Sequence, residues 1–85
     1  MNVKVISPGQ TLYDGPADAV HLPGVMGRFE VLDRHAPIIS VLTAGTVVCR
    51  NAQERTAFRV EGGFAEVSDG NVTVCVESAI PVEQP

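Results

Sequence analysis

The chain has 85 residues, of which 45% are hydrophobic, and its formal net charge at pH 7 is −4. This length fits one small domain, and the hydrophobic content excludes an intrinsically disordered protein. The acidic balance, with only six dispersed lysines and arginines, argues against binding to nucleic acid and against adsorption to an anionic membrane.

Apolar and polar residues alternate with a period of two along the first part of the chain, which is typical of half-buried strands. Glycine and proline turn signals bound each alternating run. In one run Val20 and Leu22 share a face, and His21 lies on the other face. The strands expected here are residues 2–7, 11–15, 17–24 and 28–32.

The middle of the chain is expected to contain three more strands. Residues 38–42, IISVL, are continuously apolar, which indicates a strand that is buried on both sides or pressed against a partner. Residues 45–61 are expected to form a hairpin in which the polar stretch NAQE is a longer loop.

The clearest local signal is Asp69-Gly70, which lies between two alternating runs as a favoured two-residue hairpin turn. This turn pairs Val67 with Val72 and Ser68 with Asn71. A slip of one residue would set valines against a glutamate, so the register is well specified. The register puts Ala65, Val67, Val72, Val74 and Val76 on one face of the hairpin and Phe64, Glu66, Thr73 and Cys75 on the other.

No stretch shows the periodicity of an amphipathic helix, and two prolines in the final SAIPVEQP disfavour one there. About nine to ten short, mostly antiparallel strands with glycine and proline punctuation predict an all-β fold. We expect a small β-sandwich that forms a single domain over residues 1–85.

Cys49 and Cys75 are the only cysteines. No secretion signal precedes them, so we expect a cytoplasmic protein with two free, buried thiols. A single disulfide is the alternative, which a reducing compartment disfavours. No apolar run approaches the ~18 residues that a transmembrane helix requires, so direct membrane insertion is not expected.

Two pairs of glycines have a structural interpretation. Gly24 and Gly27 lack the lysine and the following helix that a phosphate-binding loop requires, so we interpret them as turn glycines that permit a positive φ. Gly62-Gly63 is interpreted as a strand corner that bends tightly, and not as backbone that approaches a ligand.

His35 follows two acids, Glu30 and Asp33, and an acid–base pair is one interpretation of this grouping. A hydrolase or metal site needs several convergent groups, however, and His21 is the only other histidine. We therefore interpret His35 as a solvent-facing or interface residue and His21 as an exposed strand residue. No catalytic residue, metal site or cofactor is expected.

The stretch LPGVMGRFEVLDRHAP, followed in order by GTVVCR, FRVEGGFAEV and NVTVCVESA, resembles the epsilon subunit of the F-type ATP synthase. The resemblance runs from Val3 to Ala79. Members of that family carry an N-terminal β-sandwich of this length, and most continue into a C-terminal helical hairpin. This chain ends where the hairpin would begin, and its starting methionine and compact ending favour a naturally short subunit. The self-inhibition and ATP sensing attributed to the hairpin are therefore not carried over.

The resemblance implies a non-catalytic subunit of the central stalk in an F1Fo ATP synthase. Such a subunit binds the gamma subunit and the polar loops of the membrane c-ring, and it passes ion-driven rotation through gamma to the F1 catalytic head. The implied location is peripheral, at the cytoplasmic face of the bacterial inner membrane. An acidic sandwich without catalytic groups is compatible with this role.

Family positions carry over residue by residue. Pro37 fixes the backbone and biases Ala36 toward an extended conformation, so HAPII should form a stiff, partly apolar ridge. Met26 offers an adaptable apolar contact, and Arg28 stands where relatives often have an acid, which reverses the sign of any charged contact. The resemblance assigns gamma binding to Ser7, His35, Ala36, Pro37, Ile38 and Ser40, and c-ring binding to Val25, Met26, Gly27 and Arg28.

Two rival functions follow from the residues alone. A stand-alone β-sandwich module that binds a small ligand or peptide would need a concave pocket lined by aromatics. The chain has only four aromatic residues, Tyr13, Phe29, Phe58 and Phe64. A small hydrolase would use His35 with a neighbouring acid.

Overall fold

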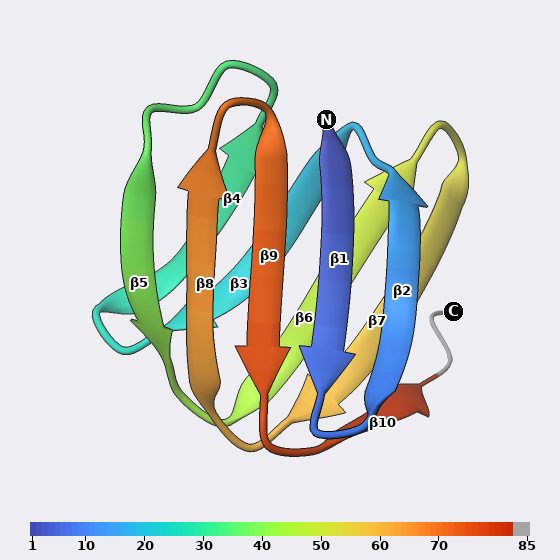
Figure 1. The fold of residues 1–85 in the computed structure, drawn as a ribbon, viewed down its shortest axis with the longest axis vertical. Coiled ribbons are helices and arrows are strands. Elements are labelled where there is room, and N and C mark those ends of the chain that lie inside the picture. The colour runs from blue at the N-terminus through green and yellow to red at the C-terminus, as the bar shows by residue number, and fades with distance from the viewer. Residues whose placement is uncertain (83–85) are drawn as a thin grey trace.

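Ten short strands build the whole of the described structure, a computed structural model that covers residues 1–82 (Figure 1). No helix occurs within that range. Residues 83–85, the end of the domain expected from the sequence, lie outside the described residues. The strands are β1 (Asn2–Ser7), β2 (Gln10–Pro16), β3 (Ala19–Gly24), β4 (Gly27–Leu32), β5 (Ile38–Leu42), β6 (Gly45–Asn51), β7 (Glu54–Val60), β8 (Gly63–Ser68), β9 (Asn71–Val76) and β10 (Ala79–Val82).

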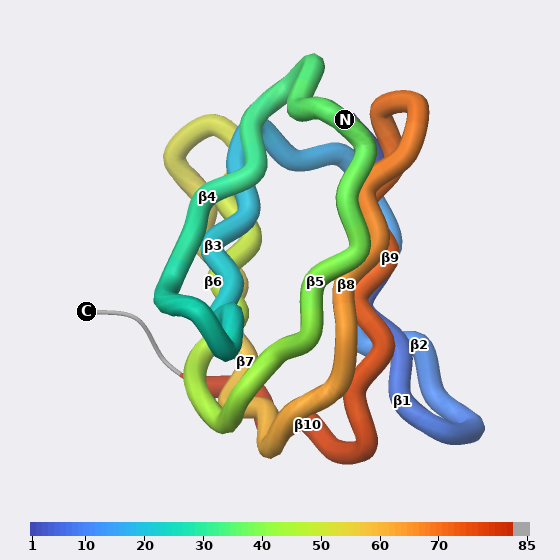
Figure 2. The backbone as a smooth tube through the Cα atoms, turned by 90° about the vertical axis from the view of Figure 1, so that its left-hand side faces the viewer, coloured from blue at the N-terminus to red at the C-terminus, as the bar shows by residue number. Residues whose placement is uncertain are grey.

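The hydrogen-bonded path runs β10-β7-β6-β3-β5-β8-β9-β1-β2, and β4 pairs with β3 beside it. A single bridge, Gly24 with Leu42, joins β3 to β5, and the path folds over there into two layers (Figure 2). We call β1, β2, β5, β8 and β9 the front sheet and β3, β4, β6, β7 and β10 the back sheet. All pairs are antiparallel except β1 with β9. The expected all-β sandwich is confirmed.

Valines from both sheets fill the space between the layers. Successive side chains of a strand point to opposite faces, and in β3 Val20 and Leu22 are fully buried while His21 stays partly exposed. A fully buried valine or leucine side chain stabilises the fold by roughly 1.5–3 kcal/mol relative to exposure. The largest fully buried side chains are Leu22, Val3, Val5, Val20, Val31, Val47, Val60, Val72, Val74 and Cys49.

The β8–β9 hairpin has the register expected from Asp69-Gly70. Val67 pairs with Val72 and Ala65 with Val74, and all four are buried. The φ angles of Asp69 (50°) and Gly70 (76°) are both positive, as a two-residue turn that matches the twist of its strands requires. The predicted register and the predicted division of residues between two faces are confirmed, and the face with the valines is the inner one.

The β6–β7 connection is tighter than expected. Asn51 pairs with Glu54, which leaves two turn residues in place of a longer loop. Ala52 adopts a positive φ of 56°, and its N–H donates to Asp18 Oδ2 at 2.6 Å. The prediction of a longer loop was wrong. This turn contains no glycine, so it lacks the usual sequence signal, and it is stabilised by the carboxylate of Asp18, which is far away in sequence.

Two strands differ from the sequence-based expectations. In β5, Ile39 is 73% and Val41 59% exposed, so the prediction that this strand is buried on both sides was wrong. The alternative, that the strand contacts a partner, stays a prediction. Strand β10 was not expected. It lies at the edge of the back sheet, where Pro81 is tolerated because an edge strand need not donate on its outer side.

Both cysteines are free thiols, as expected. Cys49 is buried in the core, and burial raises its pKa from 9.0 to about 12. Cys75 lies on the outer side of β9 and is only partly buried, so the expectation of two buried thiols was wrong for this residue.

A tight corner links β7 to β8, as the sequence predicts. Gly62 and Gly63 have φ angles of 139° and 142°, in a region that side chains rarely adopt. A methyl group on Gly63 would lie 2.0 Å from the carbonyl oxygen of Cys75, so the backbones of β8 and β9 meet closely there.

Replacing Gly63 with alanine should lower the free energy of unfolding by roughly 3 kcal/mol or more, because strain and overlap add. The matched control is Gly9→Ala, where φ is 74° and nothing lies within 4 Å of an added methyl group. In that control the free energy of unfolding should fall by only about 1–2 kcal/mol. Urea unfolding measures both, and equal losses would contradict the close approach of β8 and β9.

The Cys49 thiol should make stability fall with pH in the alkaline range. Below about pH 9 the thiol is protonated in both states; above it only the unfolded thiol ionises, because the pKa in the folded state is about 12. The stability of the wild type relative to Cys49→Ala should therefore fall by up to about 1.4 kcal/mol per pH unit. Urea unfolding of both proteins at about pH 8 and about pH 10.5 measures this, and a constant difference would contradict it.

Candidate docking surfaces

The β3–β4 turn presents an apolar tip. Gly24 pairs with Gly27, which leaves Val25 and Met26 as the two turn residues, and Gly27 has a φ of 127° that suits glycine. Met26 is 97% exposed and Val25 56%. An exposed methionine adapts its shape to the surface that it meets. Three of the four expected c-ring residues therefore lie in or beside one exposed turn.

Hydrogen bonds hold this turn against neighbouring strands. Val25 N–H donates to the carbonyl oxygen of Val41 in β5 at 3.0 Å. Arg28 Nη1 donates to the carbonyl oxygen of Thr46 in β6 at 2.9 Å, so the guanidinium, the fourth expected c-ring group, lies over the back sheet. The tip is thus apolar and its backbone is fixed.

The loop between β4 and β5 carries His35, Ala36 and Pro37, and all three are exposed. His35 N–H donates to the carbonyl oxygen of Leu32 at 3.2 Å, and the His35 ring donates from Nδ1 to that of Ala36 at 2.7 Å. Arg34 has a positive φ of 68°, which turns the chain sharply before the histidine. The expected ridge is therefore a surface feature held by its own backbone.

The six expected gamma-binding residues do not form one cluster. Through β8 and β9, Ile38 is level with Val3. Ser7 is four residues further along β1, which corresponds to roughly 13 Å along the strand. In Figure 1 the loop with His35 accordingly lies at the top of the front sheet and the β1–β2 turn at the bottom.

The outer face of the front sheet fills the distance between these ends. Val41 pairs with Phe64, Phe64 with Cys75, and Cys75 with Ile6. These four residues, which we call the front apolar row, cross β5, β8, β9 and β1. Val41 is 59% and Phe64 47% exposed, and Ile39, at 73%, lies one pair further along β5. The sequence predicted that Phe64 and Cys75 share a face, but their pairing with β5 and β1 has no local sequence signal.

Two open grooves lie on the front sheet, and each includes residues expected to bind gamma: the first overlaps the front apolar row, and the second is formed by β5, β8 and the residue before β5. The groove of about 410 Å³ is lined by residues that include Ile6, Ser7, Pro8, Phe64 and Cys75. The groove of about 390 Å³ is lined by Pro37, Ile38, Ile39, Glu66, Val67 and Ser68.

Two expected gamma-binding residues lie on the inner side of β5. Ser40 pairs with the buried Ala65, and Ile38 packs against the core. Both are partly buried. The exposed positions of the same strand are instead Ile39 and Val41.

The acids considered beside His35 have other partners. Glu30 Oε2 accepts a hydrogen bond from His21 Nε2 at 2.6 Å, and Asp33 lies 2.8 Å from the terminal amine of Met1. Over residues 1–82, no three His, Cys, Asp or Glu side chains gather in a way that could hold a metal ion. The same range contains no helix of the length and hydropathy needed to cross a membrane.

Comparison with known proteins identifies a family that shares this sequence pattern. The β-sandwich domain family of the ATP synthase delta/epsilon chain matches residues 1–82. The ATP synthase epsilon chain of Synechococcus sp. (strain PCC 6716) is 42% identical over 79 residues, which cover 93% of this chain and 57% of the relative. That of Leptospira borgpetersenii is 39% identical over 77 residues, with 91% and 61% coverage. The chain thus spans less than two thirds of either relative.

Two solved assemblies contain chains with the same fold. A chain of the Euglena gracilis mitochondrial ATP synthase, in its OSCP/F1/c-ring assembly, has a TM-score of 0.87 at 22% identity, covering 93% of this chain and 51% of that chain. A chain of the Tetrahymena thermophila mitochondrial ATP synthase central stalk and c-ring has a TM-score of 0.75 at 16% identity, with 93% and 64% coverage. On the match over residues 1–82, this chain belongs to the ATP synthase delta/epsilon β-sandwich family.

Proposed function

We propose that this chain is a non-catalytic subunit of the central stalk of an F1Fo ATP synthase, which binds gamma and the c-ring and couples ion-driven rotation to ATP synthesis. The observation that carries the proposal is the family match over residues 1–82, together with relatives named ATP synthase epsilon chain. The subunit acts at the cytoplasmic face of the bacterial inner membrane and is held there by its partners.

The c-ring contact is assigned to Val25, Met26, Gly27 and Arg28. The almost fully exposed Met26 supports this assignment because it gives a short turn an apolar anchor. Polar loops of a ring present small, repeated surfaces, and a flexible thioether can adapt its shape to the loop that it contacts. The Arg28 guanidinium, bonded to the backbone of β6, forms the polar rim of this contact.

The gamma contact is assigned to Ser7, His35, Ala36, Pro37, Ile38 and Ser40, and we extend it across the front apolar row. Ser7 and the His35 ridge lie at opposite ends of the front sheet, so one partner that touches both must cross the row between them. An interface of this kind has an apolar centre, here Val41 and Phe64, with polar groups at its rim. In this proposal gamma is the partner that the apolar residues 38–42 of β5 predict.

The two contacts belong to different parts of the sandwich. The tip is the turn of a back-sheet hairpin, whereas the row is the outer face of the front sheet. The bond from Val25 to Val41 connects the tip directly to the strand that carries one end of the row. A load applied at Met26 is therefore transmitted to the gamma contact through hydrogen-bonded backbone.

The stand-alone ligand-binding alternative has less support. The groove of about 410 Å³ is open, and Phe64 is the one aromatic among the described residues that line it. Small-molecule sites are usually concave and rich in aromatic side chains.

Co-purification of this chain from its native host, after gentle membrane extraction, tests the proposal as a whole. Near-equal recovery of gamma with the catalytic subunits and the ring is the expected result. Recovery of the chain alone, while F-type complexes stay intact in the same extract, would overturn it.

Charged residues introduced into the front apolar row should weaken gamma binding. The double variant Val41→Asp/Phe64→Asp is expected to weaken the affinity for purified gamma by at least about tenfold, because two carboxylates would be desolvated in an apolar interface. The control is Leu32→Asp, an apolar residue of the back sheet that is 48% exposed. Calorimetric titration measures both, and equal affinities would exclude the row from the gamma contact.

A charged residue at the tip should weaken the contact with the c-ring and leave the contact with gamma intact. Met26→Asp is expected to leave gamma affinity within about twofold of wild type but to weaken retention of the stalk on detergent-solubilised c-rings by about tenfold. Ile80→Asp, at a position that is 66% exposed on β10, is the matched control. Unchanged retention of Met26→Asp on the ring would remove the tip from the c-ring contact.

A further inference from the structure

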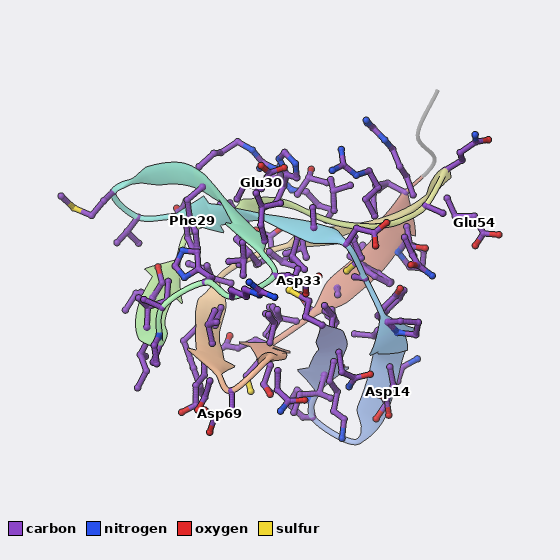
Figure 3. The ribbon with its side chains drawn as sticks, turned by 90° about the horizontal axis from the view of Figure 1, so that it is seen from above. Asp14, Phe29, Glu30, Asp33, Glu54 and Asp69 are labelled. Carbon is purple, nitrogen blue, oxygen red and sulfur yellow. The ribbon has the colours of Figure 1, made fainter. Side chains whose placement is uncertain are left out.

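The outer face of the back sheet concentrates the positive charge of an acidic chain. Five of the six basic residues are arginines, since Lys4 is the only lysine. Four of the five arginines are aligned on this face by the strand register: Arg28 opposite Pro23, Arg50 between Ala19 and Arg55, and Arg59 opposite Thr46. The labelled acids Asp14 and Asp69 lie with the front sheet, and Glu30 lies on the outer side of the back sheet (Figure 3).

A polar cleft of about 170 Å³ lies within this face. Its walls come from four adjacent strands: His21 from β3, Glu30 from β4, Val48 and Arg50 from β6, and Arg55 from β7. The cleft volume is several times the roughly 30 Å³ that one water molecule occupies in the liquid. A tetrahedral oxyanion fits a space of this size.

Arg50 and Arg55 pair directly across the β6–β7 ladder. Like charges in this arrangement destabilise a sheet unless an anion lies between them. Among residues 1–82, the ion pairs involve neither arginine. Arg59, on the same face, instead has Glu61 within 3.9 Å. The cleft therefore holds two guanidinium groups that form no ion pair within the described chain.

The acid in the cleft is already engaged. Glu30 Oε2 accepts from His21 Nε2 at 2.6 Å, so its carboxylate is turned toward β3. In the strand register His21 is opposite Val48, which is two residues along β6 from Arg50. The arginine side of the cleft is thus the part that an anion would occupy.

We propose that this cleft is a binding site for a phosphate group, held by Arg50 and Arg55 with His21 at its wall. A guanidinium donates two parallel hydrogen bonds to phosphate oxygens, so two opposed guanidiniums match the two negative charges of hydrogen phosphate. Chloride or a single carboxylate would neutralise only one of them. The site is separate from the tip and from the front apolar row, and it does not depend on the proposed function.

Titration with inorganic phosphate tests the site directly. Backbone amide chemical shifts are followed by NMR at constant ionic strength, with sodium chloride exchanged for phosphate so that screening stays fixed. Saturable shifts are expected in β6 and β7 around Arg50 and Arg55. Phosphate should also raise the Tm, because it binds the folded state alone.

Three variants distinguish a specific phosphate site from nonspecific electrostatic attraction of phosphate to the arginines. Arg50→Gln and Arg55→Gln should each weaken phosphate binding by about tenfold, since each removes a pair of charge-assisted hydrogen bonds. Arg59→Gln removes the same charge from the same face and should stay within about twofold of wild type. Without phosphate, Arg55→Gln should have a Tm no lower than wild type, because a like-charge pair is lost.

The possible outcomes divide cleanly. No saturable shift, or equal loss in all three variants, would mean an adventitious ion only and would overturn the proposal. Saturable binding that depends on Arg50 and Arg55 supports it, and vesicles then assign the source. Arginine-dependent binding to phosphatidic acid in phosphatidylcholine vesicles would assign the phosphate to a lipid headgroup. Binding of inorganic phosphate without vesicle binding would assign it to a free anion.

Discussion

The structure depends on a thin core of valines between two sheets. Because each strand turns every second residue inward, almost every other position must face outward, and the sandwich has two broad outer faces. The core contains no buried polar or charged residue within the described chain, so all charge is sorted to those faces and to the turns. What distinguishes one face from the other is then only the side chains that the strand register sets side by side.

That sorting gives the two faces different chemistry. Residues far apart in sequence, Ile6, Val41 and Phe64, form an apolar row on the front sheet, while Arg50 and Arg55 meet on the back sheet. An apolar row suits a protein partner, and opposed guanidiniums suit an anion. The two surfaces can be occupied together because the core separates them.

Local signals in the sequence were sufficient for most of the fold. Alternation separated the two faces of β8 and β9, and Asp69-Gly70 gave their register. The β6–β7 turn was not predicted, because its stability comes from Asp18, and neither was β10, whose partner β7 lies about twenty residues away. The same limit applied to the candidate docking surfaces and the cleft. The Met26 tip is formed by a local turn, so the sequence could predict it. The front apolar row and the His21–Glu30 pair arise from pairings between strands, so the sequence did not predict them.

The parallel pairing of β1 with β9 also has a consequence for how the chain folds. The first strand lies between β2 and a strand that begins at Asn71, so it cannot be seated until almost the whole chain is available. Such distant pairings slow folding, because a long loop must close before they form. Ile6 therefore joins the row late in this sequence of events, and an incompletely synthesised chain would lack the finished surface. The complete front apolar row thus exists only in chains in which β1 and β9 have already paired.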